Sequence, residues 1–250
     1  MTGCEDMTED RGCALGRIEQ MIRYVLWSSG AEGIVVGLSG GVDSAVAAAI
    51  CCRAISSENV LGLTLPTKVT REDDIRDARE LSAMLGIRHE ILDIEPILNA
   101  YRFIPGFYES PVLIGNIMAR TRMTLLYYYA NREHRLVCGT SNRTEYLLGY
   151  TTKFGDNAAD FQPIIHLYKS GVFGAARDLG IPESIISKAP SAGLWQGQKD
   201  EDELGITYRE IDEALESLER NGWLAKSPVE EKVLSLVKQN EHKRKTISLL

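Results

Sequence analysis

The fold of this chain is decided by residues 34–44, which read Ile34-Val35-Val36-Gly37-Leu38-Ser39-Gly40-Gly41-Val42-Asp43-Ser44. The β-branched start predicts a strand, the glycines predict a turn, and the alanine-rich residues 45–54 predict a helix. Glycines let a backbone approach an anion closely with its amides turned inward, and a helix N-terminus adds unpaired N–H groups. The stretch therefore predicts a phosphate-binding loop, with a chance Gly-Gly turn as the alternative interpretation.

An acid in this loop distinguishes it from the Walker type. No Lys-Ser/Thr pair follows the glycines, and Asp43 stands beside the expected phosphate. A carboxylate and a phosphate are compatible there if a cation such as Mg²⁺ lies between them. Glu145 follows another predicted strand, and the carboxyl ends of parallel strands share one edge of a sheet. We therefore predict that Asp43 and Glu145 share one Mg²⁺.

The bulk properties limit the class of protein. A chain of 250 residues can bury a full core as one domain. A net charge of −7 disfavours nonspecific nucleic-acid binding, and no apolar stretch is long enough to cross a membrane. Residues 1–13 are expected to be a flexible tail, followed by a single domain over residues 14–250. Five cysteines without metal spacing fit reduced thiols in a cytoplasmic protein.

Strand and helix signals alternate along the chain. We predict strands at residues 34–38, 60–65, 89–94, 136–139 and 161–165, and helices at residues 14–27, 43–55, 72–85 and 116–131, with Thr70 capping the third. A further helix begins at Lys169. This alternation predicts an α/β fold, a doubly wound parallel sheet of about five strands with helices on both faces.

Three regions are predicted to do more than connect one element to the next. Residues 103–111 contain two prolines and aromatic residues and could form a lid, and residues 190–202 form a loop longer than a simple connection needs. The helix 116–131 bears Tyr127-Tyr128-Tyr129, which point in three directions. One tyrosine face can meet the sheet and another is predicted to meet a second subunit. The alternative is a helix packed wholly within one chain.

The motif Ser39-Gly40-Gly41-Val42-Asp43-Ser44 resembles the pyrophosphate loop of the ATP pyrophosphatases, which cleave ATP to AMP and pyrophosphate. The loop alone leaves GMP synthetase, asparagine synthetase and tRNA-thiolating enzymes open. Further segments in one order resemble the ammonia-dependent NAD synthetases over residues 14–245, and residues 139–143 resemble their archaeal branch. These segments are residues 115–123, 139–140, 149–160, 188–192, 200–205 and 241–244.

The resemblance implies a Rossmann-like fold, similar to the adenine nucleotide alpha hydrolases, and a set of site residues. ATP would be held by Gly37, Leu38, Ser39, Gly40, Gly41, Val42, Asp43, Ser44, Thr140, Lys169 and Ser191. Mg²⁺ would be held by Asp43 and Glu145, and deamido-NAD by Arg120, Lys153, Asp160, His242 and Lys243. Lys169 would act in catalysis, and Asp156 would position ammonia or take its proton, unless it is only a turn-forming residue.

The activity implied is the last step of NAD biosynthesis. Deamido-NAD attacks the α-phosphate of ATP, pyrophosphate leaves, and ammonia then expels AMP from the acyl-adenylate. Family members share the deamido-NAD site between subunits, which implies a homodimer. Two alternatives stay open: another ATP pyrophosphatase that amidates or thiolates a different substrate, and a catalytically silent nucleotide-binding module. The second would be expected to lack Asp43, Glu145 or Lys169, and all three are present.

Overall fold

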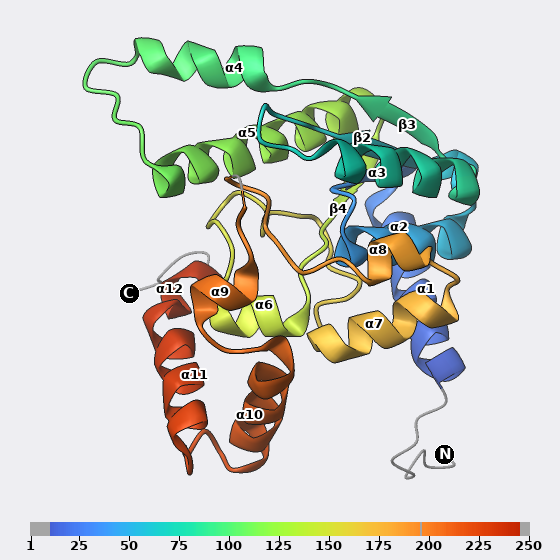
Figure 1. The fold of residues 1–250 in the computed structure, drawn as a ribbon. Coiled ribbons are helices and arrows are strands. Elements are labelled where there is room, and N and C mark those ends of the chain that lie inside the picture. Colours follow the sequence, from blue (N-terminus) through green and yellow to red (C-terminus); the bar gives the residue numbers. More distant parts are fainter. Residues whose placement is uncertain (1–10, 196, 246–250) are drawn as a thin grey trace.

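The computed structural model describes residues 11–195 and 197–245, and its centre is one parallel sheet (Figure 1). The strands are β1 (Gly33–Gly37), β2 (Val60–Thr64), β3 (Arg88–Ile91) and β4 (Arg135–Cys138), in the spatial order β3-β2-β1-β4. The chain moves outward from β1 to β2 and β3, and then returns to the other side of β1 as β4. The strand order therefore switches between β1 and β4, where ligands of such sheets bind.

The predicted fifth strand is reduced to one contact. Phe161 forms a single parallel bridge with Cys138, and Gly139 N donates to Phe161 O at 2.9 Å. Pro163 follows two residues later and has no N–H to donate, and the chain turns there instead of continuing as a strand. The expectation of about five strands is thus corrected to four within the described residues.

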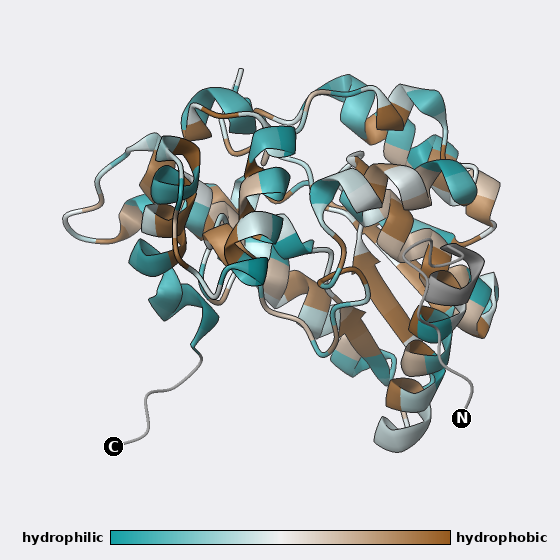
Figure 2. Cartoon of the chain, turned by 90° about the horizontal axis from the view of Figure 1, so that it is seen from below, coloured by the Kyte–Doolittle hydropathy of each residue, from teal (hydrophilic) through white to brown (hydrophobic). Residues whose placement is uncertain are grey.

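Helices cover both faces of the sheet, as predicted. Side chains alternate along a strand, so Ile34 and Val36 face one layer while Val35 faces the other. The first layer contains α1 (Arg11–Ser29), α2 (Val42–Ile55), α3 (Glu72–Leu85), α7 (Lys169–Asp178) and α8 (Glu183–Ile186). The second contains α4 (Glu95–Ala100) and α5 (Pro111–Arg132). The central strands β1 and β2 are almost wholly apolar because both of their faces are buried (Figure 2), whereas the edge strand β3 carries Arg88, His89 and Glu90 and is only partly buried.

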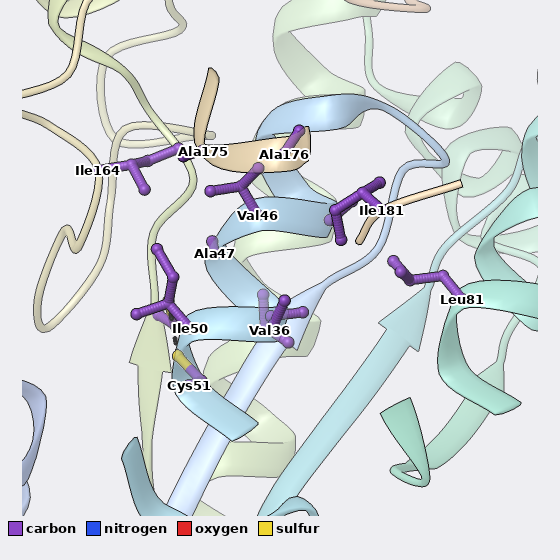
Figure 3. Packing of buried hydrophobic residues seen from close by; sticks show 14 of the residues in the cluster. Val36, Val46, Ala47, Ile50, Cys51, Leu81, Ile164, Ala175, Ala176 and Ile181 are labelled. Atoms are coloured by element: carbon purple, nitrogen blue, oxygen red, sulfur yellow. Dashed lines mark hydrogen bonds between the residues drawn. The ribbon is translucent and has the colours of Figure 1, made fainter. Parts of the chain in front are cut away.

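Helix α2 is almost entirely buried because it has neighbours on several sides. Figure 3 shows Val46 of α2 between Val36 of the sheet and Ala176 of α7, with Ile50 further along the helix beside Cys51. Small alanines let these elements approach closely, and every residue from Ala45 to Ala48 is fully inaccessible to solvent. The start of α2, which carries Ser44, is therefore held rigidly beneath the predicted phosphate loop.

A third cluster of helices adjoins the carboxyl edge of the sheet. It consists of α6 (Arg143–Leu148), α9 (Asp200–Leu204), α10 (Tyr208–Arg220), α11 (Pro228–Gln239) and α12 (Glu241–Arg244). Thr207 and Glu210 form a capping box at the start of α10, and Ile211 and Leu215 line its buried face. This packing brings the C-terminal segment next to residues 149–157.

The remaining element predictions agree with the structure within a few residues, with two corrections. Helix α5 begins at Pro111 rather than at residue 116, because Ser110 caps it by accepting from Leu113 N. Thr70 does not cap α3. Its hydroxyl accepts from Thr67 N at 2.9 Å, and Arg71 occupies the cap position.

The N-terminal residues and the connections between the main elements differ in part from the prediction. Residues 11–13 of the expected tail already belong to α1, and residues 1–10 lie outside the described part. The short helices η1 (Ser57–Asn59) and η2 (Tyr101–Phe103) lie in connections, and residues 104–110 form no helix or strand. Among the helices described, none has both the length and the apolar character needed to cross a bilayer.

Candidate active site

The predicted phosphate loop turns from β1 into α2 with a braced backbone. Gly40 has φ +77°, and a Cβ there would collide with the backbone of Asp74 in α3, so only glycine fits. The hydroxyl of Ser44 donates to Gly41 O at 2.9 Å, and the hydroxyl of Ser39 accepts from Gly41 N at 3.2 Å. The two serines therefore hold the shape of the turn.

Lys188 ties this loop to α3, a role that the sequence did not suggest. Its Nζ donates to Gly40 O at 3.0 Å and to Asp74 Oδ1 at 2.8 Å, and it also pairs with Asp77. Burial alone would raise the pKa of Asp74, but hydrogen bonds from Arg71 and Lys188 lower it. Since Asp77 is only 1% exposed, Lys188 neutralises a buried carboxylate while it holds the Gly40 carbonyl.

Two carboxylates meet one lysine at the switch point of the sheet. Lys169 Nζ lies 2.5 Å from Asp43 Oδ2 and 3.4 Å from Glu145 Oε1. Asn142 caps α6 by accepting from Glu145 N at 2.9 Å, and its amide donates to Asp43 Oδ1 at 2.8 Å. The loop after β1 and the segment after β4 are thus joined by direct contacts, which confirms that Asp43 and Glu145 project to one place.

Burial and neighbouring charges act together on this group. Burial, and then repulsion from Asp43, raise the pKa of Glu145 to about 8, against the attraction of Lys169. Burial alone would lower the pKa of Lys169, but Asp43 and Glu145 hold it above its usual value. The side chain of Lys169 is 3% exposed, so its ammonium is available chiefly to these two acids and to a ligand bound beside them.

The donor set at this point fits Mg²⁺. Within the described residues, no three His, Cys, Asp or Glu side chains are grouped so that they could enclose a metal. Mg²⁺ is commonly held by one or two carboxylates, with phosphate oxygens and waters completing the shell. Asp43 and Glu145 already converge on a cation, the Lys169 ammonium, so the two acids suit a metal that arrives with a nucleotide.

A buried acid of α10 positions Lys169. Thr144 Oγ1 accepts from Lys169 N at 3.0 Å and donates to Asp212 Oδ1 at 2.5 Å. The other oxygen of Asp212 accepts from Ser170 N at 2.8 Å. Asp212 therefore anchors the start of α7 to α6, and sequence reasoning missed it because its partners lie 42 and 68 residues away.

Four of the five predicted deamido-NAD residues come together at the C-terminal segment. Arg120 donates to Lys153 O at 3.2 Å, and Lys153 Nζ donates to His242 O at 2.6 Å. Lys243 Nζ donates to Gly149 O at 2.8 Å. These cations bond to backbone carbonyls, and Arg120 and His242 are exposed. The structure thus groups positive side chains from three distant segments.

The two aspartates of this region have different surroundings. Asp160 Oδ2 accepts from Val137 N at 2.7 Å and Oδ1 from Tyr127 OH at 3.4 Å, so Asp160 braces β4 against α5. Asp156 Oδ1 accepts from Thr152 N at 2.7 Å. Asp156 is exposed at the surface, yet the surrounding chain partly desolvates it and raises its pKa, against the attraction of Lys243.

The loop that contains Ser191 is organised around Asp200. Ser191 Oγ donates to Gln198 O at 2.8 Å, and Asp200 Oδ1 accepts from Ala192 N at 3.0 Å. Tyr208 OH donates to Asp200 Oδ2 at 3.0 Å, which links the loop to α10. Ser191 and the half-buried Thr140 lie on different segments, and their predicted contacts with ATP stay predictions.

Together, a phosphate loop at the switch point of a parallel sheet and an acid–lysine–acid group define an α/β nucleotide-binding enzyme. The family model for NAD synthase matches residues 14–247. The chain therefore belongs to the NAD synthase family, and the resemblance predicted over residues 14–245 is confirmed.

Individual relatives agree with this assignment. The NH(3)-dependent NAD(+) synthetase of Methanoregula boonei is 61% identical over 95% of this chain and 96% of its own length. That of Thermococcus kodakarensis is 45% identical over 94% and 96%. The predicted archaeal character is confirmed by these matches.

Two solved structures share the whole fold. NMN synthetase from Francisella tularensis has a TM-score of 0.88 and 39% identity, covering 97% of this chain and 98% of its own. NH3-dependent NAD synthetase from Campylobacter jejuni, in complex with nitrate, has a TM-score of 0.83 and 33% identity, covering 97% and 100%.

Proposed function

We propose that this enzyme converts deamido-NAD, ATP and ammonia to NAD, AMP and pyrophosphate. The observation that carries the proposal is the convergence of Asp43, Lys169 and Glu145 beside the phosphate loop. The silent-module alternative does not explain why a buried lysine is held between two acids next to that loop. The identity of 61% to an ammonia-dependent synthetase supports the choice of substrates.

The site residues fit the first chemical step. A carboxylate is a poor electrophile until it acquires a leaving group, so its attack on the α-phosphate of ATP makes an acyl-adenylate and releases pyrophosphate. The amides of the loop and the Lys169 ammonium stabilise negative charge on the departing pyrophosphate. Mg²⁺, held by Asp43 and Glu145, would supply further charge neutralisation.

The second step needs ammonia at the acyl carbon. Ammonia attacks the carbonyl, AMP leaves, and one proton must be lost from nitrogen. We assign the role of ammonia positioning and proton acceptance to Asp156, a carboxylate of the segment that carries Lys153 and lies beside the C-terminal residues. Arg120, Lys153, His242 and Lys243 would exchange their backbone carbonyl partners for the phosphates of deamido-NAD, and Asp160 would support this segment.

Nicotinate mononucleotide is a second candidate substrate. The Francisella structure is an NMN synthetase, and its TM-score of 0.88 exceeds the 0.83 of the Campylobacter NAD synthetase. Nicotinate mononucleotide carries the same reactive carboxylate as deamido-NAD but lacks the adenylate half. The chemistry would be the same, and only the recognition of the second nucleotide would differ.

The test is turnover with ATP, Mg²⁺, ammonium and either acid substrate, with products separated by chromatography. NAD, AMP and pyrophosphate in equal amounts are expected from deamido-NAD, with a larger kcat/KM than for nicotinate mononucleotide. Preferential formation of the mononucleotide amide would favour the second candidate. No product from either substrate, in protein that melts cooperatively, would refute both. Lys169→Met is the control and should abolish both reactions.

The predicted helix 116–131 belongs to α5, and we propose a homodimer through α5 that extends onto the adjoining α4 side of the same hairpin. Large exposed apolar side chains gather on this hairpin, which projects from the sheet in Figure 1. They are Ile97, Phe103, Ile104, Tyr108, Val112, Leu113 and Tyr128. Phe103 is 88% exposed, and it is the grouping of such side chains on one hairpin, rather than any single one, that favours an interaction surface. Light scattering should give a dimer for the native chain and a monomer for Phe103→Glu. A native monomer with full activity would exclude the proposal.

The cellular setting and domain organisation are proposed as the sequence predicted them. Cys51 and Cys138 are buried free thiols whose Sγ atoms lie 3.7 Å apart, which suits a reducing cytoplasm. Residues 14–250 are proposed to form one domain. Limited proteolysis should leave this region as a single fragment.

A further inference from the structure

One face of α5 runs from the proposed substrate segment to the phosphate loop. Asn116 Oδ1 accepts from Thr152 Oγ1 at 2.8 Å, and the side chain of Ala119 lies against Gly155. Further along, Leu126 lies against Gly37, the first residue of the loop. Arg122 is three residues after Ala119 and four before Leu126. Residues with these spacings share one face of a helix, so Arg122 lies between the two halves of the site.

The contacts of Arg122 confirm this position. Its Nε donates to Leu65 O at 3.1 Å, and Leu65 directly follows β2 at the carboxyl edge of the sheet. Burial lowers the pKa of Arg122, while attraction by Asp156 opposes the change. Arg122 is therefore attracted by Asp156, the residue to which we assign ammonia, and it is anchored at the end of β2, the strand next to β1.

The guanidinium of Arg122 is poorly satisfied. Within residues 11–195 and 197–245 it donates one hydrogen bond, from Nε, and its two terminal nitrogens donate none. The half-buried Arg135 and Arg143, by comparison, each bond a carboxylate, Glu133 and Glu219 respectively. A half-buried guanidinium whose terminal nitrogens bond no carboxylate among the described residues keeps its planar fork free, so these nitrogens of Arg122 are suited to an anionic ligand.

We infer that Arg122 binds the nicotinate carboxylate of the substrate and aims it at the α-phosphate of ATP. This inference rests on the proposed function. The planar fork of a guanidinium matches a carboxylate with two parallel hydrogen bonds. The carboxylate is also the group that must lie between the phosphate loop, where ATP reacts, and Asp156, where ammonia reacts. The carboxamide that replaces this carboxylate in the product is uncharged, so Arg122 favours the substrate over the product.

The test exploits that difference between acid and amide. Titration calorimetry would measure deamido-NAD and NAD binding to the native enzyme, Arg122→Gln and Arg122→Lys. Loss of a charge-assisted hydrogen-bonded pair should weaken deamido-NAD by ~10- to 100-fold in Arg122→Gln, and NAD by less than ~3-fold. Arg122→Lys should recover part of the loss. Arg120→Gln is the matched control and should weaken both ligands equally, because their phosphates are identical.

The outcomes separate this inference from the proposed function. Equal losses for acid and amide in Arg122→Gln, or unchanged affinity for both, would overturn the inference. A raised KM for ATP with unchanged deamido-NAD affinity would also overturn it, by placing Arg122 on the phosphate. A native enzyme that neither binds nor converts deamido-NAD would instead refute the proposed function. The pair of nicotinate mononucleotide and its amide would then test Arg122 in the same way.

Discussion

Replacement of Lys188 by methionine tests whether this lysine, which lies outside the phosphate loop, holds the loop in its conformation. Lys188 bonds the carbonyl of Gly40 and neutralises Asp74 and Asp77 of α3. Methionine keeps much of the length of the side chain but removes the charge and the donors. Two effects are expected, one on stability and one on ATP, and they can be separated.

The stability effect follows from burial. Asp77 is 1% exposed and Lys188 is 17% exposed, so the variant removes the nearer cation of a buried carboxylate and leaves only Arg76 Nη2, 3.6 Å from Asp77 Oδ1. Removing one partner of a buried ion pair costs about 3–5 kcal/mol, and urea unfolding should show a loss of this size. Adding Asp77→Asn removes the stranded charge, so Lys188→Met/Asp77→Asn should recover much of the lost stability.

The ATP effect follows from the bond to Gly40. Without the donor at 3.0 Å, the Gly40 peptide loses one of its restraints, and its neighbouring amides are less well aligned toward phosphate. Loss of one hydrogen bond from a charged donor, about 1.5–3 kcal/mol, corresponds to a rise in the KM for ATP of about 10-fold or more. The KM for deamido-NAD should change little, because its predicted contacts lie on other segments.

The double variant distinguishes positioning of the loop from charge balance at Asp77. If Lys188 positions the loop, Lys188→Met/Asp77→Asn is stable but keeps the raised KM for ATP. Asp77→Asn alone is the matched control, since it retains the bond between Lys188 and Gly40. A double variant with native stability and native KM for ATP would show that Lys188 only balances the charge of Asp77, and the positioning argument would be wrong.

Three further predictions concern the metal, the loop and the nitrogen source. Asp43→Asn and Glu145→Gln should each lower kcat by about 100-fold or more while the fold persists, and activity of the native enzyme should vanish in EDTA; full activity in EDTA would exclude the metal. Amide hydrogen exchange in residues 190–195 and 197–203 should slow when ATP and deamido-NAD bind, whereas equal rates would contradict a closing role. At fixed total ammonium the rate should rise with pH, because only ammonia has a free lone pair. Glutamine should be a poor donor, because Cys51 and Cys138 are buried and burial raises the pKa of the half-buried Cys52 thiol to about 11, which makes these thiols unsuited to act as an amidase nucleophile. Glutamine-driven turnover abolished by alkylation would refute this.

Several features of the protein were determined by the sequence alone. The β-branched residues 34–36, the paired glycines and the alanine-rich helix specify the strand, turn and helix of the phosphate loop. The cap of α6 was also marked locally, since Asn142 and Glu145 are three residues apart. Such features depend on backbone propensity and neighbouring hydrogen bonds, which act over a few residues.

Other features were decided only by the tertiary structure. Lys169 meets Asp43 across 126 positions of the chain, and Lys188 meets Gly40 across 148. Arg122 reaches Leu65 across 57 positions, and Pro163 ends the fifth strand where apolar pattern alone predicted its continuation. No local propensity encodes these pairs, because their ends become neighbours only when the sheet orders its strands and the helices pack. The sequence therefore determined which chemistry the chain carries, and packing of distant segments determined which side chains position it.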